Sequence, residues 1–184
     1  MVGQVIFEGK TKQDKQYVIR YPQEGDAQAM CDYINELSQE HTYIRFQGET
    51  VSLEDETKYL QEQLEKIRKN KTVQLLVICE GKIMGISAID LKDKTESHEG
   101  VFGISLAKDI RGEGIGKILM KLTIEEAEKH LSELRLITLG VFGDNQLAFK
   151  MYEDFDFQEY GRLPGGSLHD GNYVDHVYMY KKIR

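Results

Sequence analysis

Three glycines within five positions, followed by a helix-like run, mark the first stretch of this chain that could bind a ligand. The stretch reads RGEGIGKILMKL, from Arg111 to Leu122. The free N–H groups of a first helical turn and the helix dipole attract anions, and glycine lets the backbone approach a phosphate because it has no Cβ. Arg111 and Lys117 add positive charge on either side. We therefore expect a phosphate or pyrophosphate site, with a plain strand-to-helix turn at positive φ as the alternative.

The spacing of the glycines narrows the class of this site. They stand at Gly112, Gly114 and Gly116, which does not fit the dinucleotide pattern G-x-G-x-x-G. The Walker pattern G-x-x-x-x-G-K-[ST] also fails, because Arg111 occupies its first-glycine position and Ile118 its hydroxyl position. The pattern that the stretch does match is R-x-x-G-x-G.

A second pattern follows the apolar segment that ends near Phe142. Asn145, Ala148 and Tyr152 form the motif N-x-x-A-x-x-x-Y. Positions i, i+3 and i+7 lie within about 60° of one another on a helix, so these side chains share one face. A small Ala148 lets a cofactor pass close to the helix. An ordinary half-buried aromatic residue is the alternative interpretation of Tyr152.

Together the two patterns resemble the GNAT superfamily of acyl-CoA-dependent N-acetyltransferases, in which R-x-x-G-x-G is the pyrophosphate loop between the fourth strand and the third main helix. The resemblance runs from near Tyr17 to the end of the chain. It implies acetyl-CoA as co-substrate, no metal, and direct attack of a primary amine on the thioester. The residues that it implies for cofactor binding are Ile104, Ser105, Leu106, Arg111, Gly112, Glu113, Gly114, Ile115, Gly116, Lys117, Asn145 and Ala148.

Glu113 departs from the family pattern, which usually has a basic or polar residue at this position of the loop. Since backbone N–H groups bind the phosphates, we expect the Glu113 side chain to point to solvent.

The resemblance also implies which groups transfer protons. Tyr152 is the expected general acid for the departing CoA thiolate. The backbone from Ile104 to Leu106 is expected to pair with the pantetheine arm and to offer an N–H to the thioester oxygen. In some family members a carboxylate on the fourth strand acts as the general base, and this chain has His98 at that position. His98, Glu99 or a water is therefore the expected base, and an exposed His–Glu pair without a role is the alternative.

The acceptor amine is not identified by the sequence. The resemblance implies a pocket between the first two helices and the loop joining the last strands, which suits a small amine, an amino acid derivative or a protein N-terminus. Two other classes stay open: a non-catalytic acyl-CoA-binding sensor, which has no need of Tyr152, and a protein-modifying enzyme whose partner docks near residues 41–53. A homodimer is also compatible. The residues offered to such a pocket are His41, Tyr43, Arg45, Phe46, His169, Asp170, Tyr173 and Asp175.

Composition excludes several classes of protein. The chain has 184 residues, of which 40% are hydrophobic and 30% charged, as in a folded globular domain. No apolar run reaches the roughly 18 residues of a membrane helix. The net charge of −7 argues against broad nucleic-acid binding. Cys31 and Cys79 show neither metal spacing nor a disulfide framework, so we expect a reduced, cytoplasmic compartment. Because no apolar run is long enough for a membrane helix, we expect no membrane partner.

The elements that position these residues alternate only in the middle of the chain. Helical periodicity covers 26–39, 54–69, the run from the glycines to about Leu131, and a short segment from about Asn145 to Phe155. Strand patterns are found at 16–21, 74–79, 83–89, 98–106, 134–142, 157–163 and 172–180, the last two joined through Pro164–Gly166 and Asp170–Gly171. We expect an α/β fold, GNAT-like, with a central mixed, mostly antiparallel sheet of about seven strands flanked by about four helices. Residues 1–184 are expected to form one domain, with residues 1–15 as an extra edge strand.

Overall fold

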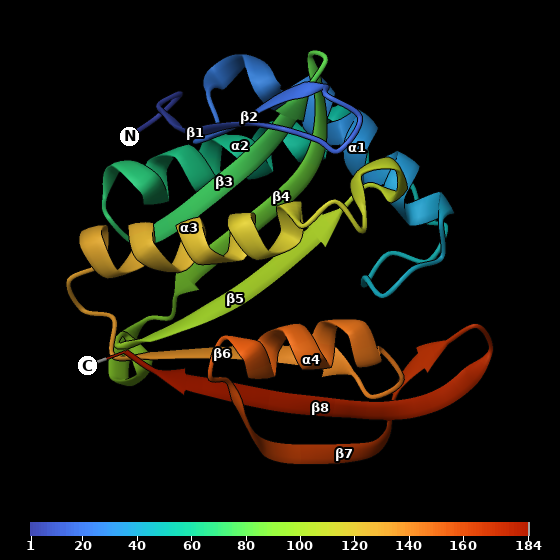
Figure 1. The fold of residues 1–184 in the computed structure, drawn as a ribbon. Helices are drawn as coiled ribbons and strands as arrows, with labels where there is room; N and C mark the ends of the chain where they lie inside the picture. Colours follow the sequence, from blue (N-terminus) through green and yellow to red (C-terminus); the bar gives the residue numbers. More distant parts are fainter. Residues whose placement is uncertain (184) are drawn as a thin grey trace.

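The computed structural model describes residues 1–183, and its centre is an open sheet of eight strands. The strands follow the order β1-β2-β3-β4-β5-β6-β8-β7 (Figure 1). Neighbours pair antiparallel except β5 and β6, which are parallel. This confirms the expected mixed, mostly antiparallel sheet. The strands are β1 (Val5–Lys10), β2 (Gln16–Arg20), β3 (Thr72–Cys79), β4 (Lys82–Leu91), β5 (Glu99–Leu106), β6 (Leu136–Phe142), β7 (Gln158–His169) and β8 (Asn172–Lys182).

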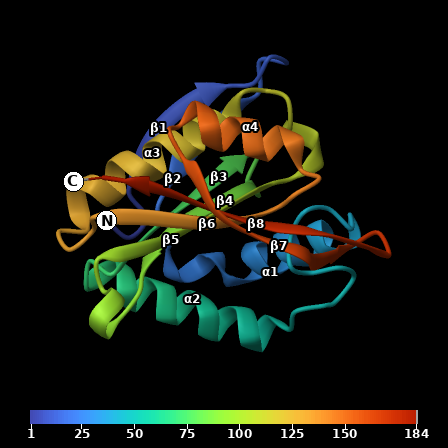
Figure 2. The same cartoon turned by 90° about the horizontal axis from the view of Figure 1, so that it is seen from below.

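Four α-helices cover the two faces of the sheet. Figure 2 shows α1 (Ala27–Gln39) and α2 (Leu53–Arg68) on one face, and α3 (Ile115–His130) and α4 (Gln146–Asp154) on the other. The start of α2 follows ordinary capping chemistry. Ser52 accepts a hydrogen bond from the backbone N–H of Asp55 at the start of α2, whose first turn is acidic and whose last turn is basic.

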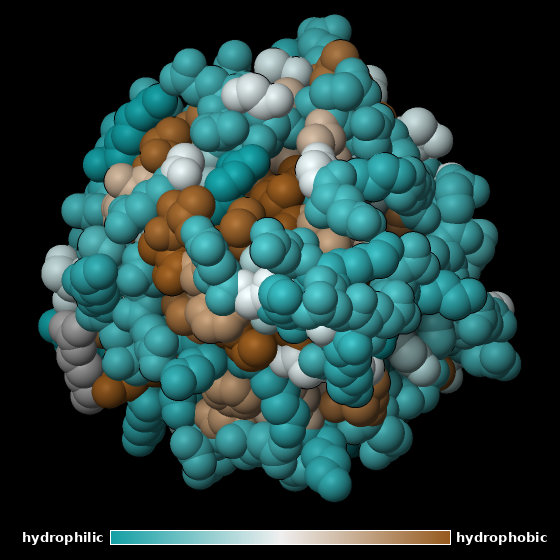
Figure 3. Space-filling model, turned by 45° about the horizontal axis from the view of Figure 1, so that its top comes forward, coloured by the Kyte–Doolittle hydropathy of each residue, from teal (hydrophilic) through white to brown (hydrophobic). Residues whose placement is uncertain are grey.

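Apolar side chains between the two helical layers form the core. β3 is buried along nearly its whole length, because helices cover both of its faces. In Figure 3 the surface turned toward the viewer is mostly hydrophilic, and hydrophobic residues form a broken band near its middle. In the described part of the chain, no helix is both long and apolar enough to cross a bilayer. The largest fully buried side chains include Tyr21, Met30, Leu60, Leu64, Ile89 and Leu119.

The expected break at Pro164–Gly166 is wrong, because β7 continues through these residues to His169. The pairing with β8 shifts between Leu163 and Ser167, so the three intervening residues form a bulge. A proline is tolerated there because β7 is the edge strand and its outer side needs no ladder donor. The bulge changes where the side chains after it point.

β5 and β6 diverge soon after they begin, and this divergence positions the site. Their parallel pairing is limited to residues 99–101 of β5 and 136–138 of β6. Beyond this point β5 stays with β4 and β6 stays with β8 (Figure 1). We call the divergence between 102–106 of β5 and 139–142 of β6 the fork. It agrees with the separation of the two strands that the resemblance implies.

Candidate active site

The glycine loop owes its shape to backbone conformations that favour glycine. Gly112 and Gly114 have φ values of +76° and +83°, where a side chain would be strained. A Cβ built on either residue meets no atom within 4 Å, so the space beside the loop is open. Gly116 differs, because its Cβ would lie 3.1 Å from Leu106 Cδ1. Two glycines therefore shape the loop, and the third lets α3 pack against the end of β5.

The first turn of α3 offers the anion-binding groups that the sequence predicted. The first backbone hydrogen bond of the helix runs from Ile118 N–H to the Gly114 carbonyl. The N–H groups of residues 115–117 therefore have no carbonyl partner within the helix. Together with the open space beside Gly112 and Gly114, they form a place where a pyrophosphate could bind.

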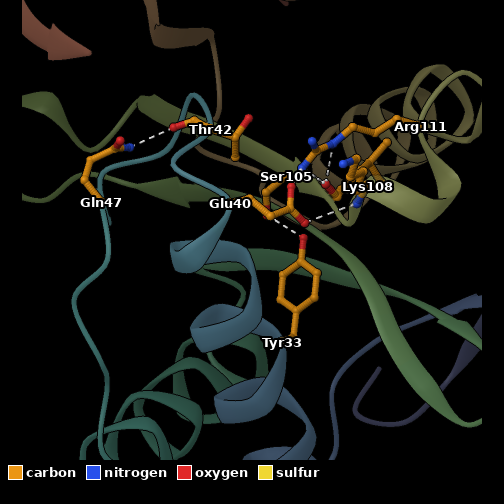
Figure 4. Close-up of polar contacts among 8 residues, drawn as sticks. Tyr33, Glu40, Thr42, Gln47, Ser105, Lys108 and Arg111 are labelled. Atoms are coloured by element: carbon orange, nitrogen blue, oxygen red, sulfur yellow. Dashed lines mark hydrogen bonds and ion pairs between the residues drawn. The ribbon is translucent and has the colours of Figure 1, made fainter. Parts of the chain in front are cut away.

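Both cations beside the loop have carboxylate partners. The Arg111 guanidinium donates two hydrogen bonds to the Leu106 carbonyl, at 2.9 and 2.8 Å, and one to Glu40 at 2.5 Å. Lys117 lies 2.7 Å from Asp154 of α4. Figure 4 shows Arg111 with Glu40, at the end of α1. In this structure Arg111 thus joins α1 to the end of β5.

The expectation that Glu113 points to solvent is wrong. Its carboxylate accepts a hydrogen bond from the Lys12 backbone N–H at 2.6 Å, and Lys12 Nζ donates to the Gly112 carbonyl at 2.6 Å. The turn between β1 and β2 therefore contacts the glycine loop directly. No local sequence signal indicates this contact, because 101 residues separate its partners.

At the fork, the backbone of β5 has polar groups without a strand partner. Ala107 N–H donates to β4 and Glu99 accepts from Lys92, so odd-numbered residues of β5 bond toward β4. Even-numbered residues therefore turn their N–H and C=O groups away from β4. The Val101–Thr138 pairing gives the Phe102 N–H the Thr138 carbonyl as its partner, so the Phe102 C=O and both groups of Ile104 point into the fork. Such groups can pair with an extended ligand as an added strand would, as expected for the pantetheine arm.

Tyr152 of α4 lies beside the fork on the α3/α4 face. Its ring is 7% exposed and packs edge-on against Phe102 of β5, with centroids 6.2 Å apart, and against Phe157 at 6.1 Å. Its hydroxyl has no hydrogen-bond partner in residues 1–183. Burial raises the pKa of Tyr152 to about 12, so the hydroxyl keeps its proton at neutral pH.

The rest of the second motif positions this helix. Asn145 is the N-cap of α4 and its Oδ1 accepts from the Ala148 N–H at 3.1 Å. Asn145 therefore has a structural role, whatever it contributes to the cofactor. Ala148 is partly buried and packs against the core.

The two expected bases lie away from the fork. His98 is exposed in the turn before β5. At a strand rise of about 3.3 Å per residue, it lies roughly 20 Å along the chain from Ile104. Burial alone would raise the pKa of Glu99, but hydrogen bonds from Lys92 and Thr138 outweigh it and lower that pKa. The structure therefore brings neither His98 nor Glu99 together with Tyr152.

The α1/α2 face of the fork carries a cluster of aromatic and histidine side chains. Tyr43, from the loop after α1, stacks on His169 with ring centroids 4.3 Å apart and contacts Phe142 at 5.8 Å. His169 is 9% exposed, and its Nδ1 lies 2.9 Å from Asp144. Of the other residues offered to the pocket, His41, Arg45, Phe46, Asp170 and Tyr173 are exposed, and Asp175 pairs with Arg162.

Two further contacts at the fork were missed by the sequence reasoning. The Tyr33 hydroxyl of α1 lies 2.9 Å from Ser105 Oγ, and burial raises the Tyr33 pKa (Figure 4). His176 of β8 lies over Gly140 of β6 and hydrogen-bonds to Ser167 at 2.8 Å. Both depend on strand register, which local patterns do not fix. In residues 1–183, no group of three or more His, Cys, Asp or Glu side chains could hold a metal ion.

Comparison with known proteins identifies the class that this fold and site define. The sequence model of the acetyltransferase (GNAT) family matches residues 27–157. The L-amino acid N-acetyltransferase AaaT of Escherichia coli (strain K12) is 32% identical over 117 residues, which are 62% of this chain and 72% of that protein. This chain belongs to the GNAT acetyltransferase family.

Solved structures share the whole architecture. A GNAT family acetyltransferase from Streptococcus pneumoniae has a TM-score of 0.83 and 26% identity, covering 91% of this chain and 99% of that chain. The structure of yncA from Salmonella typhimurium with its cofactor acetyl-CoA has a TM-score of 0.77 and 15% identity, covering 91% and 94%. The protein described here is thus an acetyl-CoA-dependent N-acetyltransferase.

Proposed function

We propose that this enzyme transfers the acetyl group of acetyl-CoA to the amino group of a free amino acid or a close derivative, with Tyr152 as general acid. The observation that carries the proposal is the position of Tyr152. Its ring is fixed against Phe102 at the fork, and its hydroxyl has no partner among residues 1–183. A hydroxyl without a protein partner at this position is available to a ligand.

The fork and the glycine loop support the cofactor's path. The pyrophosphate would bind the N–H groups of residues 115–117, and the pantetheine arm would run along Phe102 and Ile104. The thioester would then lie at the fork, with its sulfur toward α4. An N–H of β5 is placed to stabilise the charge that develops on the thioester oxygen.

The raised pKa of Tyr152 suits an acid more than a base. With a pKa of about 12, the hydroxyl is protonated at neutral pH and cannot remove a proton from the amine before attack. The Tyr152 hydroxyl can donate its proton to the departing sulfur as negative charge develops on that sulfur. We therefore assign the removal of the amine proton to another group.

A small acceptor is favoured by the α1/α2 face of the fork. Tyr43 of the loop after α1 packs on Phe142 and His169, so this loop connects α1 to the ends of β6 and β7. An amino acid is smaller than a folded protein, so it reaches the fork more readily past the loop that carries Tyr43. The curated relative from Escherichia coli is named as an L-amino acid N-acetyltransferase, which supports the same class of acceptor.

Release of the CoA thiol, followed with a panel of single L-amino acids and short peptides, tests the proposal. We expect turnover with at least one L-amino acid, and less with a peptide that carries the same residue at its N-terminus. Turnover confined to peptides would favour a protein N-terminus as acceptor. Tight CoA binding without turnover on any amine would favour the acyl-CoA sensor.

A further inference from the structure

A histidine of β8 is held over the fork in a way that no sequence motif indicates. A Cβ built on Gly140 of β6 would lie 2.3 Å from His176 Nε2. No real side chain tolerates such a contact, so only glycine at position 140 leaves room for this imidazole. The ring is held from its other nitrogen, since Nδ1 lies 2.8 Å from the Ser167 hydroxyl.

The bulge in β7 creates this hydrogen bond. Leu163 pairs with His176 and Ser167 pairs with Val174, so three residues of β7 stand opposite one residue of β8. The extra residues allow Ser167 Oγ to reach the imidazole. Bulges commonly redirect a side chain next to an active site.

Strand register places His176 beside the reacting end of the cofactor's path. Val101 of β5 pairs with Thr138 of β6, so Gly103 and Gly140 both lie two residues beyond the last pair. Both are exposed, and a Cβ on Gly103 would meet no atom within 4 Å. At this level the fork therefore has two glycines on opposite sides, and the histidine lies over one of them.

His176 and Tyr152 lie on opposite faces of the sheet. Phe142 pairs with His176, and its contact with Tyr43 places both on the α1/α2 face. Tyr152 contacts Phe102 from α4, on the other face. The attacking amine approaches the carbonyl carbon from one side, and the thiolate leaves from another. This arrangement therefore suits His176 as a base for the amine and Tyr152 as an acid for the thiolate.

We propose that His176 is the general base of this enzyme and that Gly140 makes room for it. The assignment rests on the proposed function. An acceptor ammonium over Gly103 and Gly140 gives one proton to His176 Nε2, and the amine nitrogen forms a bond to the thioester carbon. The carbon–sulfur bond then breaks and the sulfur takes the Tyr152 proton. The second proton leaving the nitrogen passes to solvent, which also reprotonates Tyr152.

The groups that contact His176 carry no formal charge. β7 presents the Ser167 hydroxyl, β8 presents the Tyr178 phenol with ring centroids 4.7 Å apart, and β6 presents Phe142 and Gly140. In residues 1–183 His176 forms no ion pair, unlike His169, which pairs with Asp144. Histidine is the side chain that ordinarily changes charge between pH 5 and 8.

The test compares His176→Asn with the same substitution at two other histidines. The asparagine amide can keep the contact with Ser167 but has no atom at Nε2. With the L-amino acid that gives the highest rate in the thiol-release panel, we expect kcat/KM of His176→Asn to fall by roughly 10²–10⁴. The decline of the wild-type rate toward low pH should disappear, and the Kd for acetyl-CoA should not change. His130→Asn, at the end of α3 and away from the fork, should match the wild type.

Two other variants make the assignment falsifiable. Gly140→Ala keeps the imidazole but displaces it, so its kcat/KM should fall at least tenfold while acetyl-CoA still binds; this test stands even if His176→Asn does not fold. A wild-type pH profile in His176→Asn, or a wild-type kcat/KM in Gly140→Ala, would overturn the proposal. Loss of the low-pH decline in His169→Asn alone would overturn it as well. If the wild-type enzyme acetylates no amine, it is the proposed function that fails.

Discussion

The Glu113 carboxylate accepts a hydrogen bond from the Lys12 backbone N–H at 2.6 Å, which connects the β1–β2 turn to the loop in front of α3. Lys12 Nζ reinforces the contact at the Gly112 carbonyl. An acidic residue is unfavourable beside a phosphate site because like charges repel. The hydrogen bond from the β1–β2 turn indicates that Glu113 holds the glycine loop in place and does not bind the phosphate.

Two substitutions at Glu113 separate these effects. Glu113→Ala removes the acceptor, and we expect acetyl-CoA to bind two- to tenfold more weakly, which corresponds to about 0.5–1.5 kcal/mol for one hydrogen bond. Glu113→Gln keeps an acceptor oxygen and removes the charge, so it should bind as tightly as the wild type or tighter. Isothermal titration measures both. Glu80→Gln, which disturbs an exposed ion pair with Lys15, is the matched control. Equal affinities for all three would show that the contact has no effect on the loop.

The positive φ of Gly114 predicts a specific cost for a side chain there. Gly114→Ala should destabilise the fold by about 1–2 kcal/mol, since the left-handed conformation is unfavourable for alanine. Acetyl-CoA affinity should fall as well, because the loop shape would change. Gly25→Ala is the control, since its Cβ would meet no atom within 4 Å and its φ is not positive. Urea denaturation that ranks the two variants equally would contradict this account of the loop.

Acetyl-CoA should stabilise the protein against heat. A ligand at one hundred times its Kd adds about 2.7 kcal/mol to the free energy of unfolding, which raises the Tm by roughly 5–10 °C in a chain of this size. Desulfo-CoA should act similarly, because the loop and the fork bind the parts that it shares with CoA. An unchanged Tm at saturating acetyl-CoA would argue against the loop and the fork as the cofactor site.

Local patterns predicted the elements that carry the cofactor site. The glycine spacing and the Asn145–Tyr152 spacing are properties of one turn and one helix, so they can be interpreted without knowing the sheet. The helices over 26–39 and 54–69 lie within one residue of the observed ones at either end. Local chemistry thus identified the loop and its helix.

The acceptor side depends on contacts between distant segments, and there the sequence was a poor guide. The strand that follows His98 was predicted, but not that His98 and Glu99 lie at its end away from the fork. His176 becomes visible only once β6 and β8 are in register and the bulge at Pro164–Gly166 is known. A one-residue slip would move every side chain of a strand to the other face, so periodicity alone cannot assign such a residue.

The kinetics of Tyr152→Phe test the central claim, acetyl transfer with Tyr152 as the acid, most directly. The substitution removes one hydroxyl that has no partner in the described residues and keeps the ring that packs on Phe102. We expect kcat to fall by roughly 10²–10⁴ with the KM for acetyl-CoA little changed. Because the pKa of Tyr152 is about 12, ionisation of this hydroxyl should not lower the wild-type rate below about pH 11. A variant with the kcat of the wild type would contradict the account and show that the thiolate leaves without a proton from Tyr152.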